Sequence, residues 1–237
     1  MMAPMSAWPG SDAWLTVAEA AEILDRTPQA VRDLIAAGTL PAQRVGRAFV
    51  VSHLEVERLQ RLPRPAGRPL TPAAAWELVA VLTAAGRQAG GVPPTAARRR
   101  QLCGRDVRDL AARLEVRAWR APVTITTSRW RRLLDDEMVV PSGDRLAATT
   151  DAYVAAADLS AVRQRYALEP AGGAGAGVLR VVPTGVPAAL APRRPRAGAA
   201  TAALDAIEDP DADRHAAGLA ELAALQERAC ARLARGG

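Results

Sequence analysis

The chain has 237 residues, 49% hydrophobic and only 3% aromatic, which is enough for one large domain or two to three small ones with a buried core. All 31 basic residues are arginine, as is typical of GC-rich bacterial coding sequences, and this bias weakens any argument from the arginine count alone. The formal net charge of +6 favours polyanionic partners only mildly. The sequence has no recognisable signal peptide and no apolar run of the ~18 residues that a membrane span needs, so we expect a cytoplasmic protein with reduced cysteines.

The positive charge is concentrated in the middle of the chain. Residues 87–132 contain twelve arginines and three acidic residues, whereas residues 11–70 contain eight arginines and seven acidic residues. From residue 133 onward, eleven arginines face fourteen acidic residues. Cys103 and Cys230 lie far apart in the sequence, and nothing in their spacing predicts a disulfide framework.

The predicted elements indicate an α+β, mostly helical fold. Residues 1–13 are expected to be a flexible arm, residues 14–62 a compact unit, and residues 63–72, with four prolines, a stiff linker. Residues 73–237 are expected to form a larger helical domain with a small sheet, subdivided near residues 140–150. In this domain we predict helices over residues 73–85, 95–114 (one helix or two), 128–134, 155–166, 201–207 and 215–233, and strands over residues 123–127, 139–140 and 178–182.

The strongest local pattern is a pair of helices over residues 17–36. Apolar residues recur where two such helices must meet, at Ala20, Leu24, Val31 and Leu34. The turn between the helices needs a residue that tolerates positive φ, and Asp25 is one of the few non-glycine types that does so readily. Thr27 is a good N-cap for the second helix, Pro28 follows at its preferred first position, and Gly38 is a natural terminator.

A short hairpin is predicted directly after this helix pair. Residues 42–45 and 48–51 read as strands around Gly46 and Arg47, and we expect Ser52 to cap a closing helix that carries Leu54, Val56 and Leu59.

Together, the phrases LTVAEAAEIL, TPQAVRDLIAAGTLPAQRVGR and SHLEVERL resemble the excisionase and MerR-like winged helix-turn-helix family. This resemblance implies that the second helix enters the major groove of double-stranded DNA and that the hairpin, as a wing, lies on the adjacent backbone or minor groove. The residues that then face the groove are Gln29, Ala30, Arg32 and Asp33.

The same resemblance places Thr27 and the helix N-terminus at a phosphate, and it makes Arg44 and Arg47 the wing contacts. Arginine reads guanine in the major groove with two hydrogen bonds, and glutamine reads adenine in the same way. Asp33, however, stands where a basic residue is common, and the whole unit is nearly neutral. The alternative is that this unit is a module that binds proteins.

No constellation of catalytic or metal-ligating residues is visible, so we expect no enzyme, no metal and no cofactor. His53 and His215 have no cysteine or acidic residue at metal-ligand spacing, and the acidic clusters near residues 135–137 and 208–213 are typical of solvated turns. The densest basic run, Arg98, Arg99 and Arg100, indicates either a secondary nucleic-acid surface or one exposed face of an arginine-rich helix.

The order of segments after the linker also resembles a family. RPLTPAAAWELVAVL, then YVAAADLSAVRQRYALEP, VLRVVP and AALDAIEDPDADRHAAGLAELAAL, following an N-terminal helix-turn-helix, are similar to AbiEi-type antitoxins of type IV toxin–antitoxin systems. The resemblance implies an autorepressor whose C-terminal domain counteracts a nucleotidyltransferase-like toxin.

Three functions therefore remain as hypotheses: an antitoxin-like transcriptional autorepressor, an excisionase-like factor that bends DNA, and a regulator that senses a small ligand. One winged unit contacts little DNA, so we expect a homo-oligomer or cooperative binding to DNA.

Overall fold

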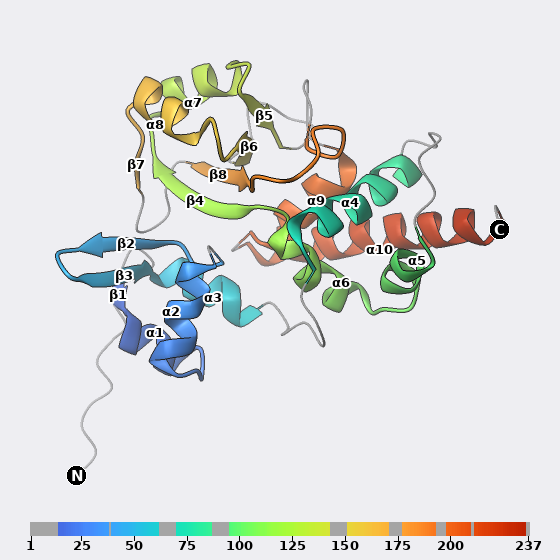
Figure 1. The fold of residues 1–237 in the computed structure, drawn as a ribbon, viewed down its shortest axis with the longest axis horizontal. Coiled ribbons are helices and arrows are strands. Elements are labelled where there is room, and N and C mark those ends of the chain that lie inside the picture. The colour runs from blue at the N-terminus through green and yellow to red at the C-terminus, as the bar shows by residue number, and fades with distance from the viewer. Residues whose placement is uncertain are drawn as a thin grey trace, which may run out of the picture.

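The computed structural model describes residues 14–37, 39–61, 70–86, 95–142, 151–170, 177–192, 198–209 and 211–235. Within these ranges the protein is mostly helical and contains two small sheets (Figure 1). None of the helices in the described ranges is long and apolar enough to cross a membrane. The expected arm (residues 1–13), Gly38, residues 63–69 of the expected linker and residues 143–150 at the expected subdivision point lie outside the described residues. The linker ends earlier than predicted, because its last expected residue, Pro72, begins a helix.

The N-terminal unit, residues 14–61, combines a helix pair with a three-stranded antiparallel sheet of order β1-β3-β2. Its small core contains Ala20, Val31, Leu40, Val51 and Val56, all fully buried. The elements of the unit are β1 (Trp14–Thr16), α1 (Val17–Ile23), α2 (Pro28–Ala36), β2 (Ala42–Val45), β3 (Ala48–Ser52) and α3 (His53–Arg61).

A five-stranded sheet of order β5-β6-β8-β4-β7 forms the second layer, in which only the β6–β8 pair is parallel. Its strands are β4 (Trp119–Thr124), β5 (Val139–Pro141), β6 (Asp151–Ala155), β7 (Glu169–Pro170) and β8 (Gly177–Val182). Helices α7 (Thr127–Leu134) and α8 (Leu159–Tyr166) pack on the sheet through Trp130, Leu133 and Val162, and in Figure 1 they lie on the side away from the N-terminal unit.

The remaining helices form a third group around a separate apolar core that contains Trp76, Leu82, Leu110, Leu204 and Leu225. The long helix α10 packs closely against α9, since a Cβ on Gly218 would lie only 2.7 Å from the carbonyl oxygen of Ala203. The elements are α4 (Pro72–Gly86), α5 (Ala96–Cys103), α6 (Val107–Leu114), the short 3-10 helix η1 (Glu115–Arg117), α9 (Ala199–Ile207) and α10 (Ala212–Arg235).

Two predicted boundaries in the second layer are wrong. The strand expected over residues 123–127 runs from Trp119 to Thr124, because Thr126 accepts a hydrogen bond from the amide of Arg129 and so starts α7. The helix expected over residues 155–166 begins only at Leu159. Ala155, the first residue of the predicted helix, instead ends β6, an unpredicted strand that pairs with β5 and β8 on both sides.

The expectation of reduced cysteines is also contradicted. Cys103, the last residue of α5, is joined by a disulfide to Cys230 in α10. The two residues are 127 positions apart in the sequence, so the sequence pattern could not reveal that α5 packs on α10 and brings their Cα atoms to 5.6 Å.

Candidate nucleic-acid interface

The helix pair of the N-terminal unit is fixed by local hydrogen bonds. At the start of α1, the amide of Thr16 donates to Glu19 Oε2 at 2.7 Å, and the amide of Glu19 donates to Thr16 Oγ1 at 3.2 Å. The Thr16 hydroxyl also donates to Glu19 Oε2 at 2.8 Å, and the two hydrogen bonds that this carboxylate accepts from Thr16 lower its pKa below 4.5. Asp25 takes the turn position with φ of +50°, as the sequence predicts, and Thr27 Oγ1 accepts from the amide of Ala30 at 3.2 Å.

The core prediction for this pair is confirmed. Ala20 and Val31 are fully buried, Leu24 is 7% exposed, and Leu34 packs against this cluster at partial burial. Since these residues hold one side of α2 inward, the opposite side of the helix is left for contacts with other molecules.

The groove-facing candidates on α2 are mostly exposed. Gln29, Arg32 and Asp33 are exposed, and Ala30 is half-buried. Gln29 Nε2 donates to Asp33 Oδ1 at 3.0 Å. One oxygen of this carboxylate, whose negative charge disfavours contact with DNA, is therefore already hydrogen-bonded. Within the described parts of the chain, no hydrogen bond or ion pair is formed by the Arg32 guanidinium, which leaves it available to a ligand.

The β2–β3 hairpin stands beside this helix and carries the other two candidates. Its turn contains Gly46 at φ of +60°, and Arg44 Nε donates to the Gly46 carbonyl at 3.2 Å. Arg47 lies exposed at the turn, while Val45 and Phe49 expose 58% and 40% of their surface. The helix α2 and the β2–β3 hairpin, which carry these candidates, thus belong to one unit at the N-terminal end of the chain (Figure 1).

Ser52 does not cap α3 as the sequence predicts. It is the last residue of β3, and its buried hydroxyl has no hydrogen-bond partner among the described residues. The antiparallel pairing of Ser52 with Trp14 extends the strand through the expected cap position.

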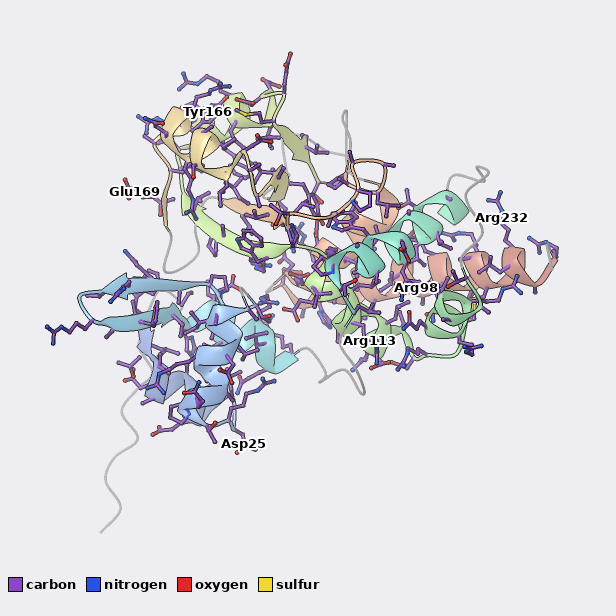
Figure 2. The ribbon with its side chains drawn as sticks, in the orientation of Figure 1. Asp25, Arg98, Arg113, Tyr166, Glu169 and Arg232 are labelled. Carbon is purple, nitrogen blue, oxygen red and sulfur yellow. A yellow bond between two sulfur atoms is a disulfide. The ribbon has the colours of Figure 1, made fainter. Side chains whose placement is uncertain are left out.

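The secondary basic run lies elsewhere. Arg98 Nε donates to Glu77 Oε2 at 2.7 Å, Arg99 donates to the carbonyl of Leu233, and Arg100 is exposed. In Figure 2, Arg98 lies among the helices on the side of the molecule away from the N-terminal unit, so the structure does not bring the two basic regions together.

A cluster of buried charges that the sequence reading missed joins the N-terminal unit to the other two layers. On the α3 side, Arg58 donates to Glu55 Oε2 at 2.8 Å, to the carbonyl of Thr39 at 3.0 Å and to Glu115. Arg120 on β4 bridges the layers, because it donates to Glu55 Oε1 at 3.1 Å and to Glu208 Oε2 at 3.3 Å.

The cluster continues into the core behind β8. Arg180 donates to Glu208 Oε2 at 2.7 Å, and its Nε lies 2.8 Å from Asp205 Oδ1. Asp205 also accepts from Arg117 at 2.6 Å and from the hydroxyl of Tyr153 at 2.8 Å. We call this set the junction cluster; its charged members are Glu55, Arg58, Glu115, Arg117, Arg120, Asp151, Arg180, Asp205 and Glu208.

The environment shifts the carboxyl pKa values of the junction cluster in opposite directions. Burial alone would raise the pKa of Glu208, but Arg180 and the other neighbouring guanidinium groups outweigh it and hold that pKa well below 4.5. Burial raises the pKa of Asp151 above 3.8, because the attraction of Arg180 does not offset the lost hydration.

A sequence signal for this cluster does exist. Arg180 interrupts the apolar strand VLRVV, and Glu55 and Arg58 lie on the same side of α3 as Val56 and Leu59. Charged residues within apolar patterns of this kind indicate buried ion pairs.

Comparison with known families assigns the N-terminal unit. Residues 14–61 match the model of a helix-turn-helix domain. The matched range begins with β1 and ends with α3, so it coincides with the unit that carries α2 and the hairpin. Neither the comparison with curated proteins nor that with solved structures gives a match. The helix-turn-helix domain indicates a DNA-binding regulator, in which α2 is the second helix of the motif.

Proposed function

We propose that this protein is a sequence-specific transcription regulator that binds double-stranded DNA through residues 14–61 and catalyses no reaction. The observation that carries the proposal is the helix-turn-helix match over a unit whose second helix leaves Gln29, Arg32 and Asp33 exposed. In this proposal α2 lies in the major groove, where Arg32 reads guanine and Gln29 reads adenine.

The hairpin acts as a wing in the same proposal. Arg44 and Arg47 contact phosphates or the minor groove beside the α2 site, and Thr27 with the N-terminus of α2 holds a further phosphate. Since one unit offers few phosphate contacts, binding needs a homo-oligomer or cooperative neighbours. Gel filtration with and without the bound duplex tests this part; a strict monomer in both states contradicts it.

The direct test is selection of bound duplexes from a random-sequence library, followed by footprinting of the selected site. The proposal expects one enriched sequence and a protected site that disappears for Arg32→Ala. Retention of the same site by Arg32→Ala, or enrichment of no sequence, contradicts it. Arg228→Ala, exposed on α10 and outside all of the DNA-binding candidates, serves as the matched control and leaves the selected site unchanged.

A narrower function rests on the resemblance of the segments after residue 70 to AbiEi-type antitoxins. In that case the selected site lies in the protein's own promoter, and the chain restores growth when it is co-expressed with a neighbouring nucleotidyltransferase-like toxin. An excisionase-like role predicts instead that the bound duplex is bent, which fluorescence energy transfer between the duplex ends measures directly. Absence of both promoter binding and growth rescue removes the antitoxin proposal but leaves the regulator proposal intact.

A further inference from the structure

A pocket of about 390 Å³ lies between the N-terminal unit and the five-stranded sheet. One side is formed by β1, β2 and the start of α3, and the other by β4 with one residue from α8. Figure 1 shows the hairpin and β4 facing each other across this region. The volume is in the range of sites that hold small molecules, and domain interfaces are among their preferred positions.

The aromatic lining of the pocket comes from both sides. Trp14 on β1 exposes 39% of its surface, although tryptophan is among the most costly residues to leave in water. Trp119 on β4 is half-buried and lines the same pocket. Two indole rings with apolar neighbours such as Leu40 and Pro122 favour a planar, largely apolar occupant.

The charged lining is positive overall. Arg44, Arg120 and Arg163 line the pocket with a single carboxylate, Glu55. Both oxygens of Glu55 are already engaged, since Oε1 accepts from Arg120 and Oε2 from Arg58. Arg163 is half-buried on α8, and its guanidinium forms no hydrogen bond or ion pair with any residue in the described ranges. An anionic group on the occupant would meet this cation.

Ser52 adds a polar group that lacks a partner. It is 4% exposed and lines the pocket, and its hydroxyl forms no hydrogen bond within the described residues. Leaving a buried hydroxyl unpaired is unfavourable, so an occupant that supplies a hydrogen bond is favoured at this position.

We infer that this interdomain pocket binds a small aromatic carboxylate of one or two rings. The ring packs against Trp14 and Trp119, the carboxylate pairs with Arg163, and Ser52 supplies a further hydrogen bond. The occupant contacts both the DNA-binding unit and the sheet, so it is an effector of the proposed regulator; this regulatory part rests on the proposed function, whereas binding itself does not.

The expected effect on DNA binding follows from charge. Arg44 lines the pocket and is also a proposed wing contact, and a bound anion near it lowers the positive potential that DNA meets. The acid therefore weakens DNA binding, and by reciprocity DNA weakens binding of the acid by the same factor.

Calorimetric titration of the full chain tests the pocket without DNA. The probes are benzoate, salicylate and indole-3-acetate, each compared with its neutral amide. At least one acid is expected to bind with 1:1 stoichiometry. Its dissociation constant should be about tenfold or more lower than that of its amide, because the carboxylate forms one charge-assisted hydrogen bond that the amide lacks. Failure of all three acids to bind, or equal binding of acid and amide, overturns the proposal.

Two variants locate the binding. Arg163→Gln is expected to weaken the bound acid about tenfold or more, and Ala42→Phe, at an exposed strand position that lines the pocket, is expected to block binding by filling it. Arg129→Gln, an exposed arginine on α7 outside the lining, is the matched control and leaves affinity unchanged. An affinity that is unaltered in Arg163→Gln and Ala42→Phe places the acid elsewhere and refutes the assignment.

The regulatory part is tested by repeating DNA binding at a saturating concentration of the acid that binds best. Weaker DNA binding for wild type, with no change for Ala42→Phe, supports it. Acid binding without any change in DNA affinity overturns regulation while leaving the pocket in place. Failure of the proposed function is distinguishable from both, because then no specific DNA binding occurs even without the acid.

Discussion

Replacing Arg58 with methionine is expected to destabilise the protein far more than an exposed substitution of the same kind. Arg58 joins α3 to the rest of the protein, with only 5% of its side chain exposed. Methionine has a similar length but no charge, so the change leaves Glu115 and Glu55 with less compensation in a buried position. Breaking a buried ion pair by removing one partner costs about 3–5 kcal/mol.

For a chain of this size each kcal/mol shifts the unfolding midpoint by about 2–4 °C, so Arg58→Met should lower the midpoint of the N-terminal unit by about 6–20 °C. Differential scanning calorimetry measures this shift and shows whether residues 14–61 then unfold separately. The matched control is Arg228→Met, since Arg228 pairs with Glu221 at 3.2 Å where both side chains are about half exposed. Such a surface pair contributes about 0–1 kcal/mol.

The double variant Arg58→Met, Glu115→Leu is expected to recover part of the loss, because it removes the carboxylate left without its cation. If Arg58→Met costs no more than Arg228→Met, the junction cluster does not hold the N-terminal unit, and the reasoning above is refuted.

Three further predictions concern the buried charges and the disulfide. Asp151→Asn should lower the free energy of unfolding less than Asp205→Asn, because burial raises the pKa of Asp151 and its contact with Arg180 Nε is long, at 3.5 Å. Asp205→Asn should cost about 3–5 kcal/mol, since it breaks several buried charged contacts, and equal urea midpoints for the two variants would contradict this. The pKa of Glu208 is depressed in the folded state, so its contribution to stability is present above pH 4.5 and should be lost as pH falls through the lower folded-state pKa. Urea unfolding of Glu208→Gln should therefore show a shallower acid dependence than wild type, and an unchanged dependence would contradict the assignment. Cys103 and Cys230 are 127 positions apart, and reducing the disulfide between them should lower the free energy of unfolding by about 2–5 kcal/mol. Dithiothreitol should therefore lower the urea midpoint of the wild type but not that of Cys103→Ser. A wild-type midpoint that dithiothreitol leaves unchanged would contradict this prediction.

Structural features that depend on residues close together in the sequence could be predicted from it. The positive φ of Asp25, the cap at Thr27 and the apolar contacts between α1 and α2 are local properties, and all are confirmed. The β2–β3 hairpin was also predicted within one residue, because Gly46 marks its turn.

Features that depend on distant partners were missed. The strand β6 was not predicted, and its last residue, Ala155, was placed in the following helix, because β6 gains its partners only from the distant strands β5 and β8. Ser52 was read as a cap because its pairing with Trp14 is not visible in the pattern. The disulfide depends on the packing of α5 against α10 in the same way.

The functional residues can be divided in the same way, into those that depend on neighbouring residues and those that depend on distant ones. The residues on α2 and the hairpin follow from the helix-turn-helix pattern, since that unit folds from contiguous sequence. The junction cluster and the interdomain pocket combine residues from α3, β4, α8 and α9, so they appear only once the layers are packed together.

The central claim is that α2 reads DNA, and fluorescence anisotropy of the selected duplex across a salt series tests it most directly. Wild type should bind specifically, with a log–log salt slope of about −0.9 for each phosphate contact. Arg32→Ala should lose about 1–3 kcal/mol of discrimination against a substituted site. Binding that ignores both the DNA sequence and Arg32 would contradict the account and make residues 14–61 a protein-interaction module.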